Sequence, residues 1–159
     1  MYAATGLNGT GREHALAVRG PASGVDAPGI IRSARGARSY ANDIMLKHMM
    51  DAVTEIYPQI PVCVHLDHGN EPATCMTAIQ AGFPSVMMDG ALKAGGKTPG
   101  EWDYNVGVTK TVTDMAHHGG IAVERGLGGL GWIERGRSRD EDGPGFADRP
   151  QPAPSPTPA

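Results

Sequence analysis

The sequence predicts an α/β fold in which about four strand–helix units follow one another as part of a (β/α)8 (TIM) barrel. Between residues 26 and about 124, short apolar runs alternate with segments of helical periodicity, the pattern of a parallel sheet with helical connections. Four successive apolar runs end in polar residues: Ser33, Asp67-His68, Asp89 and Glu124. A barrel draws functional groups from many strand ends, whereas a doubly wound sheet gathers them at one switch point, so the barrel is favoured.

The N-terminal 25 residues carry weak patterns. They are rich in glycine and lack a hydrophobic period, so we expect at most one or two helical turns, over 13–18. The first clear strand is the apolar run at 28–31, which ends near Ser33. Ser39 is the expected cap of a helix that runs to about residue 56, before Pro58. The apolar stripe of this helix has helical spacing: Met45, Met49, Val53 and Ile56.

The middle of the chain has the cleanest signals. A strand is expected at 62–66, a helix at 72–81 that buries Met76 and Ile79, and a strand at 85–88. Thr98 is the expected cap of the next helix, with a proline and a glutamate in its first turn. Its apolar face and the strand after it follow at the expected spacing: Val108, Val112 and Met115, then 121–123.

Composition divides the chain into three parts and excludes several classes of protein. We expect a degenerate glycine-rich segment at 1–25, a partial barrel at 26–143 and a disordered proline-rich tail at 144–159. The net charge of −3 gives no reason to expect a nucleic acid or an anionic membrane as partner. Apolar runs are too short for a membrane span, and no signal peptide is visible. Cys63 and Cys75 fall at positions expected to be buried, which suits a reducing, cytoplasmic location.

The run at 62–70 carries the strongest functional signal. Its apolar residues end in His65, Asp67 and His68, and the run at 85–88 ends in Asp89. A carboxylate beside an imidazole supplies a proton carrier and a metal ligand. Bland interpretations stay open: His65 as a core histidine, and Asp89 as the cap of a turn. Arg35 and Arg38 either bind phosphate or pair with helix acids; the sequence does not decide between these.

The stretch from residue 25 to about 143 contains several long sequence motifs, in the same order as in one enzyme family, and so resembles that family. These motifs lie at residues 25–28, 34–46, 65–70, 73–75, 85–94 and 97–99. They resemble the class II, zinc-dependent fructose-bisphosphate aldolases of bacterial glycolysis and the Calvin cycle. The resemblance implies a (β/α)8 barrel that reversibly cleaves fructose 1,6-bisphosphate to dihydroxyacetone phosphate and glyceraldehyde 3-phosphate. It also implies a Zn²⁺ cofactor, with a place for a second divalent cation, and a sugar phosphate as substrate.

The resemblance assigns roles to particular residues. It implies that Asp67 is the proton donor, that His68 binds catalytic zinc and that Asp89 binds a second metal. Glu124 matches an acid on the fifth strand of the family and is a weaker metal candidate, while Gly126 stands where the family has a metal-binding glutamate. The substrate-contacting serine of the family is matched by Ala34, which leaves the adjacent Ser33 as a weak substrate-binding candidate.

The family's first strand and its later metal-binding strands have no recognisable match in this sequence. We therefore expect a truncated aldolase that is inactive by itself. The alternative is a catalytically inactive metal-binding or interaction fragment, or a truncated gene product without a function. Exposed barrel edges would favour a homo-oligomer or other self-association.

Overall fold

The computed structural model describes residues 4–95 and 98–126, and every structural statement below concerns these residues. Ten helices and strands follow one another in them: β1 (Thr5–Asn8), α1 (Arg12–Gly24), β2 (Gly29–Ala34), α2 (Arg35–Ala41), α3 (Asp43–Ile56), β3 (Val62–Gly69), α4 (Pro72–Gln80), β4 (Ser85–Met88), α5 (Trp102–His117) and β5 (Ala122–Arg125). The prediction of a disordered tail at 144–159 lies outside the described residues.

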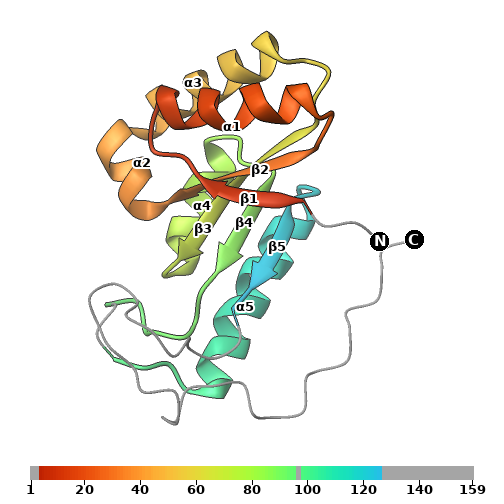
Figure 1. Ribbon diagram of the computed structural model, residues 1–159. Coiled ribbons are helices and arrows are strands. Elements are labelled where there is room, and N and C mark those ends of the chain that lie inside the picture. The colour runs from red at the N-terminus through yellow and green to blue at the C-terminus, as the bar shows by residue number, and fades with distance from the viewer. Residues whose placement is uncertain (1–3, 96–97, 127–159) are drawn as a thin grey trace, which may run out of the picture. The chain divides into compact units, whose positions relative to one another are not determined.

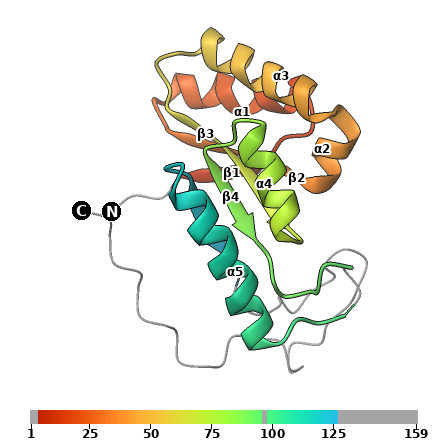
Figure 2. The ribbon, with the colours of Figure 1, turned by 180° about the vertical axis from the view of Figure 1, so that it is seen from behind.

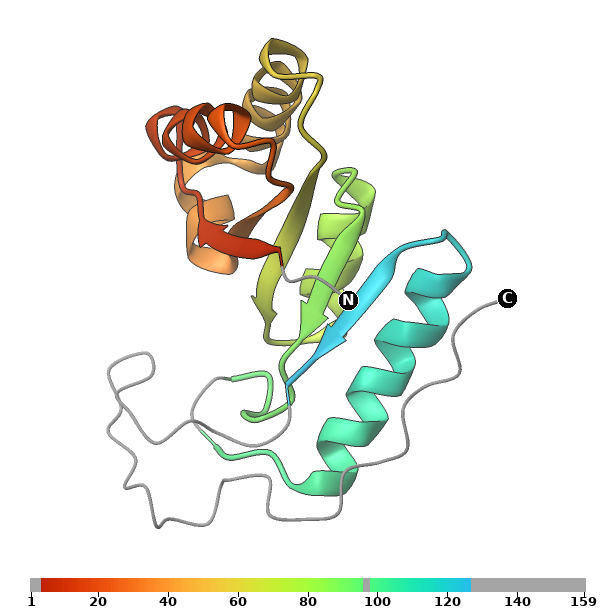
Figure 3. The ribbon, with the colours of Figure 1, turned by 45° about the vertical axis from the view of Figure 1, so that its right-hand side comes forward.

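The strands form one parallel sheet in the order β1-β2-β3-β4-β5 (Figure 1). Each strand therefore pairs with the next one along the chain, as in a barrel, whereas a doubly wound sheet reverses its strand order. From behind, α4 and α5 stand in front of the strands, and α3 lies above them, in front of α1 (Figure 2). In Figure 3, α1 lies beside the first strands and α5 beside β5, so the helices follow the sheet from one edge to the other. The predicted α/β architecture with consecutive strand–helix units is confirmed.

The core lies between the helices and one face of the sheet. Alternate residues of the strands point into it, and they include Ile31, Leu66 and Val86, each at most 1 % exposed. The helices contribute side chains that are at most 3 % exposed: Leu46, Met50 and Val53 from α3, Cys75 and Ala78 from α4, and Val112 from α5. We call the other side of the sheet, which the helices do not cover, the open face. In each strand, the residues that alternate with the core-facing residues point to the open face.

The N-terminal segment is more ordered than its composition predicted. The expectation that the family's first strand is missing was wrong, because β1 pairs with β2 from Thr5 to Asn8. The one or two helical turns expected at most over 13–18 are part of α1, which has 13 residues. Arg19 anchors this helix: its fully buried guanidinium donates to the carbonyl oxygens of Ile60, at 3.0 Å, and Tyr57. These partners lie about 40 positions away, so no local pattern reveals them.

The helix predicted from Ser39 is two helices, α2 and α3. They meet at Asn42, whose φ of 67° ends α2 and whose side chain caps α3 by accepting from the Ile44 N–H at 3.0 Å. Ser39 is therefore not the cap. The predicted apolar stripe is correct at Val53, which is buried, but Met45 and Ile56 are exposed. Leu46 and Met50 are buried, and Met49 is only partly buried against the core.

Helix α5 begins later than its sequence predicted. Its first residue is Trp102 and its N-cap is Glu101, so Thr98 is not the cap. Thr98 instead accepts a hydrogen bond from the Lys93 N–H through its carbonyl oxygen, in a short antiparallel bridge next to Pro99. The predictions for α4 and β4 agree with the structure within one residue. Within the described ranges, no helix is long and apolar enough to cross a membrane.

Candidate active site

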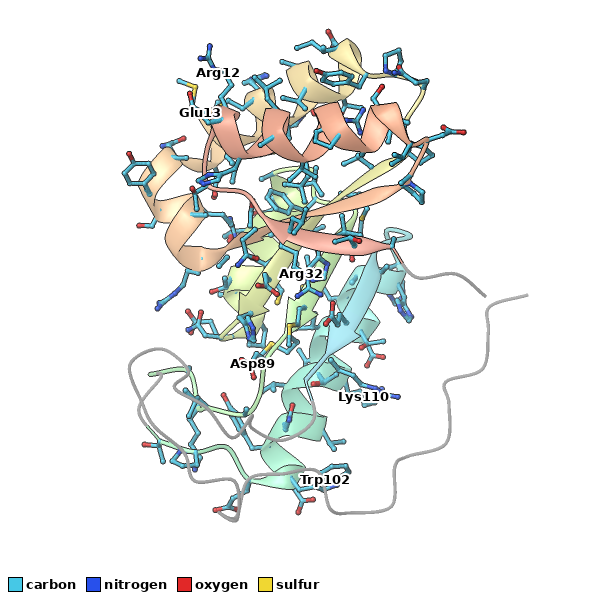
Figure 4. The ribbon with its side chains drawn as sticks, in the orientation of Figure 1. Arg12, Glu13, Arg32, Asp89, Trp102 and Lys110 are labelled. Atoms are coloured by element: carbon cyan, nitrogen blue, oxygen red, sulfur yellow. The ribbon has the colours of Figure 1, made fainter. Side chains whose placement is uncertain are left out.

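The carboxyl ends of β3 and β4 bring three predicted site residues together. Asp67 and His68 are among the last three residues of β3, and Asp89 directly follows β4. The Asp89 N–H donates to the carbonyl oxygen of Gly69 at 2.8 Å, so the two strand ends are tied by their backbones. Figure 4 shows Asp89 at the end of β4, with Arg32 further up over the middle of the sheet.

His68 and Asp89 are in direct contact. His68 Nδ1 lies 2.8 Å from Asp89 Oδ2, and the two side chains are 30 % and 13 % exposed. The pairing of β3 with β4 is irregular between Leu66 and Gly69, and His68 has a φ of 50°. A positive φ is uncommon for a histidine and occurs where the surrounding structure imposes it. This irregularity turns His68 out of the alternation of β3 and toward Asp89.

Asp89 also shapes the turn that follows it. Its second oxygen, Oδ1, accepts from the Ala91 N–H at 3.1 Å. The bland interpretation of this residue is therefore correct as far as the turn is concerned, but it does not exclude a ligand role, because the other oxygen faces His68. A carboxylate held at both oxygens is fixed in orientation, which favours binding to a defined partner.

Asp67 occupies the open face of β3. It is 6 % exposed, and its nearest cation is Arg32, whose Nη1 lies 3.7 Å from Asp67 Oδ1. This distance brings the charges together but is too long for a hydrogen bond. Among the described residues, Asp67 Oδ1 has no hydrogen-bond partner. A buried carboxylate oxygen without a partner is able to accept a proton or a hydrogen bond from a bound molecule.

His65 lies two positions before Asp67 on β3, on the same open face, and contacts side chains of both β4 and β5. Its Nδ1 lies 2.8 Å from Ser85 Oγ, and its Nε2 lies 3.2 Å from Glu124 Oε2. Burial lowers the pKa of His65 despite the opposing effects of Glu124 and Asp67, so the neutral imidazole is favoured. The core-histidine interpretation holds for its burial, at 3 % exposure, but its partners are side chains and not a backbone carbonyl.

Ser33 and Arg38 are held by structural contacts. Ser33 is fully buried on the helix side of β2 and donates to the carbonyl oxygen of Gly9 at 3.0 Å. Its predicted contact with substrate stays a prediction. Arg38 forms a two-point ion pair with Asp43, with N–O distances of 2.8 and 2.7 Å. The alternative left open for Arg38 is thus decided in favour of a helix acid.

Arg32 is the residue that the sequence analysis missed. It lies between Ile31 and Ser33, which both point to the core, so the period of two along a strand places it on the open face. The register pairs it with His65 of β3. An arginine inside a short apolar strand was the signal that would have revealed it.

Comparison with known proteins identifies the family. The family model described as fructose-bisphosphate aldolase class-II matches residues 1–152.

The chain belongs to the class II fructose-bisphosphate aldolase family.

The resemblance seen in the sequence is thereby confirmed, and the match begins at residue 1, in agreement with the presence of β1.

Relatives in this family are similar over most of the chain. It is 56 % identical over 144 residues to fructose-bisphosphate aldolase 2 of Cereibacter sphaeroides, covering 91 % of this chain and 41 % of that protein. It is 53 % identical over 145 residues to the fructose-bisphosphate aldolase of Rhizobium meliloti (strain 1021), covering 91 % and 40 %. The chain thus spans about two fifths of the length of these curated relatives.

Solved structures agree on the fold. The crystal structure of the YdjI aldolase from Escherichia coli K12 matches with a TM-score of 0.70 at 28 % identity, over 80 % of this chain and 45 % of that one. A putative fructose-1,6-bisphosphate aldolase from Coccidioides immitis matches with a TM-score of 0.73 over 91 % and 48 %. At 23 % identity, this second likeness shows the fold alone. The partial TIM barrel predicted from the sequence is confirmed.

Class II aldolases are metal-dependent, and the described residues supply only part of a metal site. His68 and Asp89 form a pair, Glu124 faces His65, and Gly126 has no side chain to offer. In the part of the chain that the structure describes, no three His, Cys, Asp or Glu residues form a group that would hold a metal ion. A catalytic zinc ion normally takes three protein ligands. The described residues therefore do not fit a complete zinc site.

Proposed function

We propose that this chain takes part in the reversible aldol cleavage of fructose 1,6-bisphosphate to dihydroxyacetone phosphate and glyceraldehyde 3-phosphate. Membership of the class II aldolase family supports the proposal, and homologues in this family act on sugar phosphates. One observation of the structure carries it: Asp67, His68 and Asp89 gather at adjacent strand ends, with His68 and Asp89 only 2.8 Å apart. In barrel enzymes this end of the sheet is where the chemistry takes place.

Asp67 is the residue proposed to move a proton. Aldol cleavage removes the proton of the hydroxyl group next to the breaking carbon–carbon bond and delivers a proton to the carbon left behind. A general acid or base must reach its proton within hydrogen-bond distance, and Asp67 Oδ1 is buried with no hydrogen-bond partner among the described residues. The guanidinium of Arg32 places a positive charge beside this carboxylate, with Nη1 3.7 Å from Asp67 Oδ1.

His68 and Asp89 are the described residues that we propose as metal ligands, with zinc as the metal and with Glu124 as a weaker candidate. A complete site needs at least one further ligand from outside the described residues, since these alone form no group of three. The place in glycolysis or the Calvin cycle and the cytoplasmic location, both expected from the sequence, stay predictions.

A second candidate is a metal-binding or interaction chain without turnover. The incomplete donor set of the described residues favours it. Strands β1 and β5 lie at the two ends of the sheet order, and Leu7 on β1 is 45 % exposed. An open strand edge pairs readily with another chain, so we include a homo-oligomer or other self-association in this candidate.

Zinc content and cleavage of fructose 1,6-bisphosphate, measured on the purified chain and on Asp67→Ala and His68→Ala, separate the candidates. Aldolase function predicts that both variants lose turnover and that His68→Ala also loses zinc. Asp51→Ala and His48→Ala, both at exposed positions of α3, are the matched controls and should change neither quantity. Bound zinc without turnover supports the second candidate. Turnover that survives Asp67→Ala contradicts the role given to this carboxylate.

A further inference from the structure

Unpaired polar atoms gather at one place on the open face of the sheet. Among the described residues, four buried side-chain atoms have no hydrogen-bond partner, and three of them belong to Arg32, His65 and Asp67. These atoms are Arg32 Nε, His65 Nε2 and Asp67 Oδ1, whereas the fourth belongs to Arg19 in α1. His65 Nε2 still lies 3.2 Å from Glu124 Oε2, so Arg32 Nε and Asp67 Oδ1 are the two atoms of this cluster with no partner at hydrogen-bond distance. Buried polar atoms are paired in the great majority of cases, so two exceptions on neighbouring side chains call for a bound partner.

The three residues are neighbours through the geometry of the sheet. Arg32 and His65 are register partners on β2 and β3, and His65 and Asp67 lie two positions apart on the same strand, hence on the same face. Arg32 Nη1 lies 3.7 Å from Asp67 Oδ1. The side chains of His65 and Asp67 are 4 % and 9 % exposed, and that of Arg32 is 36 % exposed. The cluster is therefore buried at its base and reached from the side of Arg32.

Gly6 of β1 leaves the space that the guanidinium fills. A Cβ at this position would lie 2.6 Å from Arg32 Nε and 3.2 Å from Arg32 Cζ. Any side chain there would push the guanidinium away from its present place. The residue pair Gly6 and Arg32 thus holds a positive charge at the middle of the sheet, close to the proposed proton carrier Asp67.

The chemistry of these atoms selects a hydroxyl group. Arg32 Nε–H is a donor and Asp67 Oδ1 is an acceptor, so the group that satisfies both must accept one hydrogen bond and donate another. A hydroxyl does this with a single oxygen atom. A phosphate group accepts only, and it would meet the carboxylates of Asp67 and Glu124, both within reach of His65.

We propose that Arg32 is a substrate-binding residue that, together with Asp67, holds a hydroxyl group of the sugar phosphate. The Arg32 Nε–H donates to the hydroxyl oxygen, and the hydroxyl proton is donated to Asp67 Oδ1. The identity of the ligand rests on the proposed function. The pairing places a substrate hydroxyl on the carboxylate proposed to carry its proton, with the guanidinium next to the oxygen on which negative charge develops.

Binding of fructose 1,6-bisphosphate to the full chain, measured by calorimetry in the presence of a chelator, tests the proposal without relying on turnover. Arg32→Leu removes the donors and should weaken binding by about 10-fold or more, as the loss of a charged hydrogen bond implies. Arg32→Gln keeps an N–H donor and should restore part of the affinity. Arg12→Leu, at an exposed position of α1, is the matched control and should bind like the wild type. Circular dichroism verifies that each variant is folded.

The side-chain ¹⁵N–¹H signal of Arg32 Nε gives a second readout. It should shift when fructose 1,6-bisphosphate is added and stay unchanged with inorganic phosphate. The proposal would be overturned if Arg32→Leu bound fructose 1,6-bisphosphate as tightly as the wild type, or if the wild type did not bind it. It would also be overturned if the Arg32 Nε signal did not shift with fructose 1,6-bisphosphate, since only water would then occupy the site. Turnover without any effect of Arg32 would leave the aldolase function standing and refute this inference. Binding that depends on Arg32 but leads to no turnover would support this inference and contradict the proposed aldolase function.

Discussion

Arg38 offers a sharp test of how the structure is held together. Its buried guanidinium donates to both carboxylate oxygens of Asp43 and, at 3.0 Å each, to Thr74 O and Thr77 Oγ1. It also lies 5.8 Å from the centre of the Phe83 ring. One side chain therefore links α2, the start of α3, and α4, the helix that follows the strand carrying the proposed proton donor. Its removal should loosen all three.

The size of the effect follows from burial. Breaking a buried ion pair costs about 3–5 kcal/mol, most of which comes from the charge left without a partner. In Arg38→Ala that charge is Asp43, whose side chain is 39 % exposed and regains water, so we expect the lower end, about 3 kcal/mol. Asp43→Ala strands the arginine, which is only 6 % exposed, and should cost at least as much as Arg38→Ala.

Urea unfolding followed by circular dichroism measures these free energies, and the same helix provides a control. Lys47 and Asp51 of α3 form an ion pair at 2.5 Å, with side chains 44 % and 51 % exposed. Asp51→Ala should therefore cost only about 0.5 kcal/mol, as exposed pairs do. If Arg38→Ala and Asp43→Ala also stayed within about 0.5 kcal/mol of the wild type, the reasoning from burial would be refuted. Weaker phosphate binding in a fully stable Arg38→Ala variant would revive the phosphate interpretation.

Three further substitutions test the end of β3, helix α2 and helix α4. A Cβ at Gly69 would lie 2.6 Å from Cys75 Sγ and 2.7 Å from the Met87 carbonyl oxygen, so Gly69→Ala should lower the unfolding free energy by about 1–3 kcal/mol. Gly36→Ala, which meets nothing within 4 Å, should be neutral or stabilising by up to about 1 kcal/mol, and equal effects of the two would contradict this account. Burial raises the pKa of the Cys75 thiol to about 11, so this thiol should resist a disulfide reagent at neutral pH until the protein unfolds. Because the pKa of Cys75 in the folded protein lies above the ordinary 9.0, the stability linked to the protonated thiol is present below about pH 9 and is lost as the pH rises toward 11. Cys75→Ala should remove this part of the decrease in stability between about pH 9 and 11.

Much of the sheet was predictable because its signals are local. Strand β4 and helix α4 were placed within one residue, since each is a short run bounded by glycine, proline or charged residues. Strand β1 and helix α1 were missed for the opposite reason. Only pairing with β2 holds β1, and Arg19 holds α1 through carbonyl oxygens about 40 positions away. Tertiary contacts of this kind leave no periodic trace in the sequence.

Helix α3 shows the limit of hydrophobic spacing. Met45 and Leu46 are adjacent, and so are Met49 and Met50, so two apolar stripes of equal period run along this helix. The structure buries Leu46 and Met50 and exposes Met45, while Met49 packs partly buried against the core. The spacing alone does not distinguish the stripes.

The meeting of Asp67, His68 and Asp89 followed from the rule that parallel strands end at one edge of the sheet. The contact between His68 and Asp89 did not follow from it. A regular strand points alternate residues to opposite faces, and the contact needs the irregular pairing of β3 with β4 and the φ of 50° at His68. A deviation from regular geometry is what joins the two strands at the candidate site.

Glu124 shows how the contact partner decides what a strand-end acid does. Its Oε2 lies 3.2 Å from the Nε2 of His65, a side chain that is 4 % exposed and already contacts Ser85. A metal bound at Glu124 Oε2 would take this oxygen from the imidazole, whose buried Nε2 would lose that contact. The metal roles of Glu124 and of Asp89, whose carboxylate lies against the predicted ligand His68, stay predictions. The structure therefore gives each of the two acids, which the sequence could place only at the ends of their strands, a histidine as its neighbour: His65 for Glu124 and His68 for Asp89.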